Sequence, residues 1–133
     1  MDRLFVDTGA WFAFFNRGDP DHEPVAEVLT QWQGRLVTSD YVFDELVTLL
    51  RYRVGHSRAR RGGDVVRSND IVVMVAVESG DIEQAWKQFV RHHDKRYSFT
   101  DCTSFAVMKR LGLSTAAAVD ADFRRSGLQT LPR

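Results

Sequence analysis

Acidic residues follow two of the short apolar segments in this sequence. Asp7 comes directly after Leu4-Phe5-Val6, and Asp120 comes directly after the small-residue run 116–119, with Asp122 close behind. If both segments are parallel strands, their carboxyl ends meet at one edge of a sheet, where open α/β sheets bind their ligands. The spacing therefore predicts a cluster of carboxylates at that edge.

Two further acids can join this cluster. Glu45 lies in the predicted helix 40–54, which follows a second short strand, and it sits at the edge of the apolar face of that helix. Asp101 opens a later helix, directly after Ser98-Phe99-Thr100. Clustered carboxylates raise one another's pKa, and Mg²⁺ or Mn²⁺ relieves that repulsion because these ions prefer oxygen ligands. Such an ion also activates water and neutralises charge on a phosphate. These four acids predict a metal site suited to phosphodiester hydrolysis.

Each acid also has a simpler interpretation when it is considered alone. Asp7 can cap the helix that follows it, and Glu45 can be a solvated acid on a helix surface. Asp101 is the last residue of a Ser-x-x-Asp capping box, whereas Asp120 and Asp122 can be turn residues. The metal interpretation depends on their joint placement at one edge of the sheet.

The triplet Asp7-Thr8-Gly9 has a second chemical interpretation. An apolar run ending in Asp-Thr-Gly is how an aspartic protease of the retroviral kind presents its catalytic carboxylate. Such proteases are almost entirely β, whereas here the chain continues into Trp11-Phe12-Ala13-Phe14-Phe15, which favours helix. The sequence therefore argues against a protease.

Short apolar strands alternate with helices along the whole chain. The predicted strands are 4–6, 36–37, 71–77, 116–119 and 128–131. The predicted helices are 10–15, 22–32, 40–54, 81–92, 99–111 and a short one from Ala121, while 58–67 is either a short helix or a loop. This alternation predicts a Rossmann-like, three-layer α/β/α sandwich with a short central parallel sheet.

The composition favours a soluble domain. With 133 residues, of which 44% are hydrophobic, the chain suits a single domain over 1–133 that buries most of its apolar side chains. Cys102 is the only cysteine, so an internal disulfide is excluded, and no apolar run is long enough to span a membrane. The N-terminal residues do not form a signal peptide. We expect a cytoplasmic protein that does not enter membranes.

Arginines are concentrated in one segment although the net charge is zero. This segment can contact RNA phosphates, can be a solvated basic surface, or can pair with an acidic partner. Its members are Arg51, Arg53, Arg58, Arg60, Arg61 and Arg67, with Asp64 as the single acid among them.

Aromatic residues are concentrated near the N-terminus. We expect most of their area in the core and the remainder in an exposed patch for a partner helix or a second copy. The residues concerned are Trp11, Phe12, Phe14, Phe15 and Trp32.

Four motifs, in order, resemble one known family. They are FVDTGAWFAF with a following DPDH, TSDYVFDELVTLLRYRVGH, YSFTDCTSFAVMKRLG and VDADFRRSG. The sequence resembles the PIN domain, and within it the VapC-type toxins of toxin–antitoxin pairs. The resemblance implies a PIN-like fold, an endoribonuclease that uses a metal-activated water, and a cognate antitoxin, with a homodimer also expected. It implies that Asp7, Glu45, Asp101 and Asp120 bind Mg²⁺ or Mn²⁺.

The same resemblance identifies secondary positions and leaves alternatives open. Thr8 matches a hydroxyl position near the first aspartate, and Asp122 falls where a residue supporting the metal ligands can lie. Gly9 departs from the serine that many relatives carry, which puts a side-chain hydrogen bond there in doubt. A nuclease of the same fold that cuts DNA or flaps, or a catalytically silent domain that binds RNA or a partner, stays an alternative.

Overall fold

The computed structural model describes residues 2–68 and 70–133, in which strands and helices alternate as the sequence predicts. The strands are β1 (Arg3–Val6), β2 (Arg35–Ser39), β3 (Val72–Val75), β4 (Thr115–Ala117) and β5 (Gln129–Leu131). The helices are α1 (Thr8–Phe15), α2 (His22–Gln31), α3 (Asp40–Arg53), α4 (His56–Arg67), α5 (Ser79–Arg91), α6 (Phe99–Leu111) and α7 (Ala121–Arg124).

All strand pairings in the described residues are parallel, in the order β3-β2-β1-β4-β5. Phe5 of β1 lies opposite Val37 of β2 on one side and Ala116 of β4 on the other. From β1 the chain first builds outward through β2 and β3, and then returns to place β4 on the other side of β1. The strand order therefore reverses between β1 and β4, and in open parallel sheets ligands bind beyond the carboxyl ends of the strands at such a point.

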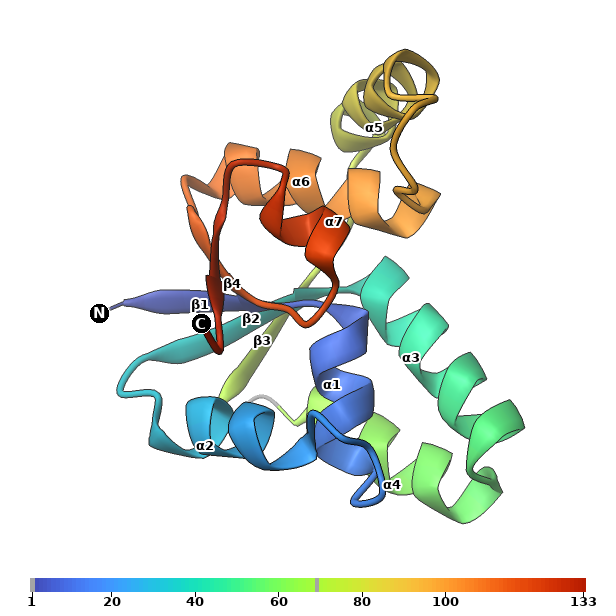
Figure 1. Ribbon diagram of the computed structural model, residues 1–133, viewed down its shortest axis with the longest axis vertical. Helices are drawn as coiled ribbons and strands as arrows, with labels where there is room; N and C mark the ends of the chain where they lie inside the picture. The colour runs from blue at the N-terminus through green and yellow to red at the C-terminus, as the bar shows by residue number, and fades with distance from the viewer. Residues whose placement is uncertain (1, 69) are drawn as a thin grey trace.

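The helices cover both faces of the sheet (Figure 1). In this view α1, α2 and α4 lie below the sheet and α6 lies above it, with α5 still farther from the sheet, beyond α6. β1 is buried on both faces, so Leu4, Phe5 and Val6 are all inaccessible to solvent. The predicted three-layer α/β/α sandwich with a central parallel sheet is confirmed.

The segment 58–67, which the sequence left open between helix and loop, is part of helix α4. Its two consecutive glycines are buried rather than in a turn. A Cβ atom at Gly62 would lie 2.9 Å from Leu50 Cδ1 and 3.2 Å from Phe15 Cδ2. Glycine therefore lets α4 approach α3 and α1 closely. Glycine usually disfavours helix, so the sequence did not reveal that these two glycines lie inside one.

The aromatic side chains near the N-terminus pack in the core or against it. Trp11 and Phe15 are buried, and Phe12, Phe14 and Trp32 pack against the core as half-buried side chains. Exposed aromatic area lies instead on α5, where Trp86 is 56% exposed and stacks on Phe89. None of the helices in the described residues is long and apolar enough to cross a bilayer.

Candidate active site

Asp7 lies at the carboxyl end of β1, beside β4. Its backbone N–H donates to Ala117 O at 3.0 Å, so the pairing of β1 with β4 extends to the aspartate itself. Asp7 occupies the N-cap position of α1, yet its side chain makes no capping hydrogen bond. The carboxylate is 4% exposed and its Oδ1 has no hydrogen-bond partner among the described residues. The capping interpretation therefore does not account for this buried acid.

A buried polar chain fixes the backbone that presents Asp7. The Trp11 indole N–H donates to Thr38 Oγ1 at 3.2 Å, and the Thr38 hydroxyl donates to Val6 O at 3.0 Å. All three residues are buried, where such hydrogen bonds are strong because the local dielectric is low. The strand end before Asp7 is therefore held by α1 and β2 together.

The first turn of α1 packs closely against the segment that follows β4. A Cβ atom at Gly9 would lie 3.0 Å from Val119 Cγ2, which is tighter than ordinary contact. This close approach leaves little room for a side chain at position 9. The neighbouring Thr8 is buried, and its hydroxyl has no partner among the described residues. Thr8 therefore brings an unpaired hydroxyl next to Asp7.

Asp101 lies in the first turn of α6, and its capping-box interpretation is correct. Ser98 N–H donates to Asp101 Oδ2 at 3.0 Å, and Asp101 N–H donates to Ser98 Oγ at 2.9 Å. The half-buried carboxyl nevertheless has its pKa raised to about 6, by burial and by the charges of Asp120 and Glu45. The capping box thus orients Asp101 toward the other acids.

Asp120 and Asp122 lie at the start of α7, where the chain leaves β4. Asp120 is the N-cap of α7, and its Oδ1 accepts from the Asp122 N–H at 2.8 Å. Asp122 Oδ1 in turn accepts from Arg125 Nη1 at 3.1 Å. The turn interpretation is thus correct for the backbone here, and it places both side chains beyond the end of β4.

Glu45 comes from α3, which begins directly after β2. The Ser39 hydroxyl caps this helix by accepting from Val42 N–H at 3.1 Å. Glu45 is half-buried and lies between Val42 and Leu46 in the sequence, both of which are fully buried. Glu45 therefore lies at the edge of the buried face of α3, which agrees with its position on the apolar arc.

Three other acids are close enough to Asp7 for their charges to act on it. The pKa of Asp7 is raised to about 8 by burial first and then by the charge of Asp101, with further contributions from Glu45 and Asp120. The four acids come from the end of β1, α3, α6 and the β4–α7 junction, on the side of the sheet where the strand order reverses. Their mutual repulsion is the condition that a cation would relieve.

The donor atoms fit a hard divalent cation, although the carboxylates are not placed as ligands. In residues 2–68 and 70–133, no three His, Cys, Asp or Glu side chains are grouped closely enough to hold an ion. The helix caps use only Oδ2 of Asp101 and Oδ1 of Asp120, and Asp7 Oδ1 is unpaired. Oxygen atoms are thus available from three acids, and carboxylate oxygens suit Mg²⁺ or Mn²⁺. Cys102 offers no thiolate, because burial raises its pKa to about 11.

The arginine-rich segment lies at the far end of α3 and along α4, rather than among the acids. Arg53 is eight residues beyond Glu45, about 12 Å along the helix. Its guanidinium lies 5.8 Å from the centroid of the Phe12 ring. Of the predicted set, Arg51, Arg53, Arg60 and Arg61 are exposed and Arg58 is half-buried.

Comparison with known proteins agrees with this fold. Residues 4–127 match the PIN domain family. A relative from Mycobacterium tuberculosis, named 23S rRNA-specific endonuclease VapC20, is 40% identical over 124 residues, covering 93% of this chain and 94% of the relative. This chain therefore belongs to the PIN domain family, and within it to the VapC-type toxin ribonucleases.

Solved structures agree with this assignment. The crystal structure of M. tuberculosis VapC20, described as a toxin that cleaves the sarcin-ricin loop, has a TM-score of 0.89 at 38% identity, covering 94% of this chain and 95% of that one. The structure of VapBC2 from Rickettsia felis has a TM-score of 0.69 at 10% identity, over 97% of each chain. The latter likeness concerns the fold alone.

Proposed function

We propose that this protein is the toxin of a toxin–antitoxin pair and cleaves RNA as an endoribonuclease that depends on Mg²⁺ or Mn²⁺. The observation that supports the proposal is the buried Asp7 at the end of β1, whose Oδ1 has no partner among the described residues and whose pKa is raised by burial and by the charges of Asp101, Glu45 and Asp120. A buried carboxyl group with an unpaired oxygen does not stabilise the fold, so the presence of Asp7 favours a chemical role for it.

In this mechanism the carboxylates would hold a divalent cation, and the cation would attract the phosphate. When bound, a divalent ion supplies an activated water and neutralises charge that develops on the phosphate. Asp7, Asp101 and Asp120 offer the oxygen atoms described above, and Glu45 completes the set. The rigid backbone around Asp7 and the capping box around Asp101 keep both carboxylates oriented before substrate arrives.

Two neighbouring side chains support this arrangement. The unpaired Thr8 hydroxyl is positioned to donate to a phosphate oxygen or to a carboxylate of the cluster. Asp122, held by Arg125, fixes the turn that carries Asp120. We assign Thr8 and Asp122 as positioning residues rather than as catalytic residues.

The substrate we propose is structured ribosomal RNA. The VapC20 relative, at 40% identity, is named as a 23S rRNA-specific endonuclease. The sarcin-ricin loop named for its crystal structure is therefore the first target to examine. The protein partner is a cognate antitoxin, in keeping with the VapC-type relatives. A homodimer stays a prediction, and the exposed Trp86 and Phe89 of α5 are a surface on which to test it.

The test is cleavage of 23S rRNA fragments and total RNA by purified protein with Mg²⁺, with Mn²⁺ or with EDTA. Wild type is compared with Asp7→Asn and Asp101→Asn, and Asp44→Asn is the matched control because Asp44 is an exposed acid next to Glu45 on α3. We expect cleavage by wild type and Asp44→Asn only, abolished by EDTA. Equal cleavage by all preparations indicates a contaminating nuclease. No cleavage by folded, antitoxin-free wild type contradicts the proposal.

A further inference from the structure

A groove beside the acid cluster has no part in the chemistry described so far. It has a volume of about 740 Å³ and lies between α5 and α6, with the segment after α7 closing one side. None of the four clustered acids lines it. Aromatic and apolar side chains, Tyr97, Phe105 and Leu113 among them, form part of its wall.

The charges that line this groove are predominantly positive. Lys95, Lys109 and Arg125 line it, and neither lysine makes an ion pair within residues 2–68 and 70–133. Its single acid, Asp81, is 4% exposed, and both of its carboxylate oxygens accept from Arg110 Nε, at 3.0 and 3.1 Å. The groove therefore presents net positive charge on a chain whose overall charge is zero.

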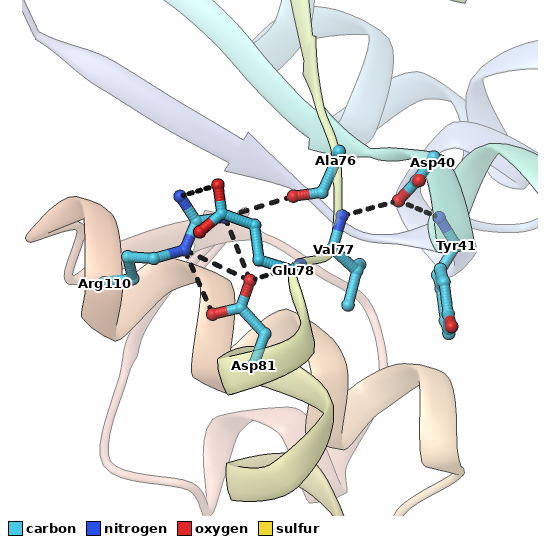
Figure 2. Close-up of polar contacts among 7 residues, drawn as sticks. All are labelled: Asp40, Tyr41, Ala76, Val77, Glu78, Asp81 and Arg110. Carbon is cyan, nitrogen blue, oxygen red and sulfur yellow. Dashed lines mark hydrogen bonds and ion pairs between the residues drawn. The ribbon is translucent and has the colours of Figure 1, made fainter.

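The wall of the groove is held rigidly where α5 begins (Figure 2). Arg110 Nη2 donates to Ala76 O at 3.1 Å and pairs with Asp81 Oδ2 at 2.9 Å, which ties α6 to the connector between β3 and α5. On the other side of that connector, Asp40 Oδ1 accepts from Val77 N–H at 2.9 Å. The start of α5 is thus fixed from two helices, and the groove is formed before any ligand binds.

The groove begins where the acid cluster ends. Arg125 lines the groove and pairs with Asp122, whose N–H donates to Asp120 in the cluster. Tyr97 also lines the groove, with its ring 5.1 Å from Phe105, and its pKa is raised by burial and then by charges that include Asp122 and Asp101. Arg125 and Tyr97 therefore lie at the junction between the negative crevice and the positive groove.

We propose that the α5–α6 groove binds the phosphodiester backbone of the RNA on one side of the scissile bond, through Lys95, Lys109 and Arg125. The inference rests on the proposed function, because the acid cluster must hold one phosphate of the same strand. Arg125 lies beside the cluster, and Lys109 lies eight residues beyond Asp101, about 12 Å along α6. The cations therefore extend away from the cluster and compensate the repulsion that its carboxylates exert on the neighbouring part of that strand. Tyr97, an aromatic side chain beside the cations, suits a base next to the cut.

Binding is tested in the Asp7→Asn background, where cleavage does not deplete the ligand. The probe is a fluorescent RNA hairpin with the 23S rRNA sarcin-ricin loop sequence, titrated at several salt concentrations. We expect Lys95→Gln/Lys109→Gln to raise Kd about tenfold and to lower the slope of log Kd against log salt by about two, one for each phosphate contact. The single variant Lys109→Gln is expected to give about half of that change in slope.

The matched control is Lys87→Gln/Arg91→Gln. These residues are exposed on α5 but do not line the groove, so the same charge is lost from the same region without loss of the proposed contacts. This control is expected to leave Kd and slope unchanged. Equal effects of the two double variants, or no effect of either, overturn the groove as a phosphate site.

The outcomes separate the groove from the proposed function. With Asp7 restored, the groove variant is expected to raise KM with kcat retained. Groove-dependent binding without any cleavage by wild type supports the groove and contradicts the nuclease proposal. Cleavage with RNA affinity independent of the lysines supports the nuclease and overturns the groove. Loss of affinity for an acidic antitoxin segment alone, with RNA binding unchanged, overturns it in favour of a protein site.

Discussion

After burial, the negative charge of Asp101 is the largest cause of the raised pKa of Asp7, which reaches about 8. One carboxylate ends the central strand β1 and the other opens α6, so the fold brings together two acids that are far apart in the sequence. The pKa of Asp101 is itself raised to about 6. In the metal-free protein, both groups therefore keep their protons at pH values where isolated aspartates have lost them.

This relationship predicts that the metal-free protein loses stability as pH rises. A carboxyl whose pKa is higher in the folded state binds more protons there than when unfolded, so the free energy of unfolding falls between the two pKa values. For Asp101 the window runs from 3.8 to about 6, and for Asp7 from 3.8 to about 8. Within a window each group contributes up to about 1.4 kcal/mol per pH unit. Urea unfolding in EDTA across this range measures the slope.

The control for the pH dependence is Asp7→Asn, which removes the group with the wider window. Its stability is expected to change less with pH than that of wild type, above all between pH 6 and 8, where Asp101 has already lost its proton. Parallel curves for wild type and Asp7→Asn would show that Asp7 does not titrate in this window.

A divalent ion is predicted to reverse the effect of pH. Mg²⁺ or Mn²⁺ competes with protons for the carboxylates, so metal is expected to raise Tm more at pH 8 than at pH 6. Asp7→Asn is expected to be at least as stable as wild type in EDTA and to gain less from metal, because a buried ionisable group is removed together with a ligand. Thermal unfolding with and without metal measures both effects.

Asp44→Asn serves as the comparison, since it removes an exposed carboxylate that neighbours Glu45 in the sequence of α3. Its Tm is expected to respond to metal as wild type does. An equal loss of metal stabilisation in Asp44→Asn and Asp7→Asn would indicate nonspecific ion binding and would contradict a site at Asp7.

Gly62 is predicted to be intolerant of a side chain. In Gly62→Ala the new Cβ would crowd Leu50, which is fully buried and cannot move freely, and Phe15 on α1. We expect a loss of about 1–3 kcal/mol in the free energy of unfolding, as for other overpacked positions. Gly80→Ala in α5 is the control, because its Cβ meets nothing within 4 Å, and it is expected to stabilise by up to about 1 kcal/mol. Chemical denaturation of both variants tests the contrast; equal effects would mean that α4 does not require glycine here.

Arg110 is predicted to stabilise the protein through Asp81. Burial alone raises the pKa of Asp81, but hydrogen bonds from Arg110 and from the Glu78 backbone outweigh it and hold that pKa below its usual value. In Arg110→Gln the buried carboxylate loses its partner, and we expect a loss of about 1–3 kcal/mol, measured by urea unfolding at neutral pH. The difference is expected to shrink in acid, because a lowered carboxyl pKa stabilises only above its unfolded value.

Lys109→Gln is the matched control, since Lys109 is the adjacent exposed cation without an ion pair among the described residues. It is expected to change stability by less than about 0.5 kcal/mol. Equal losses in the two variants would contradict a specific role for the pairing with Asp81.

The sequence alone was sufficient to predict the order of the elements and the type of all but α4, because their apolar periodicity is strong. Asp7 and Asp120 could be assigned to one sheet edge from the βαβ pattern and the rule for parallel strands. Each residue's simpler role proved compatible with the proposed one: Asp101 caps α6 and also lies in the acid cluster. Periodicity cannot reveal that a single carboxylate does both.

Other features depend on contacts between distant segments. The burial of Gly62 against Leu50 and Phe15 requires knowledge of how α4 crosses two other helices. The α5–α6 groove likewise gathers Lys95, Lys109 and Arg125 from three parts of the chain, and the sequence does not show that these parts meet. The arginine-rich segment was conspicuous in the sequence, yet it lies along α3 and α4, away from the acids.

The position of β4 has a consequence for the timing of activity during synthesis. β4 pairs with β1 in the interior of the sheet, although β1 is made first and β4 is made near the end of the chain. A ribosome extends the chain by about 5–20 residues per second, so β1 waits several seconds for this neighbour. Until β4 docks, Asp120 cannot join the other three acids. A nascent chain therefore carries the first three acids before the cluster is complete.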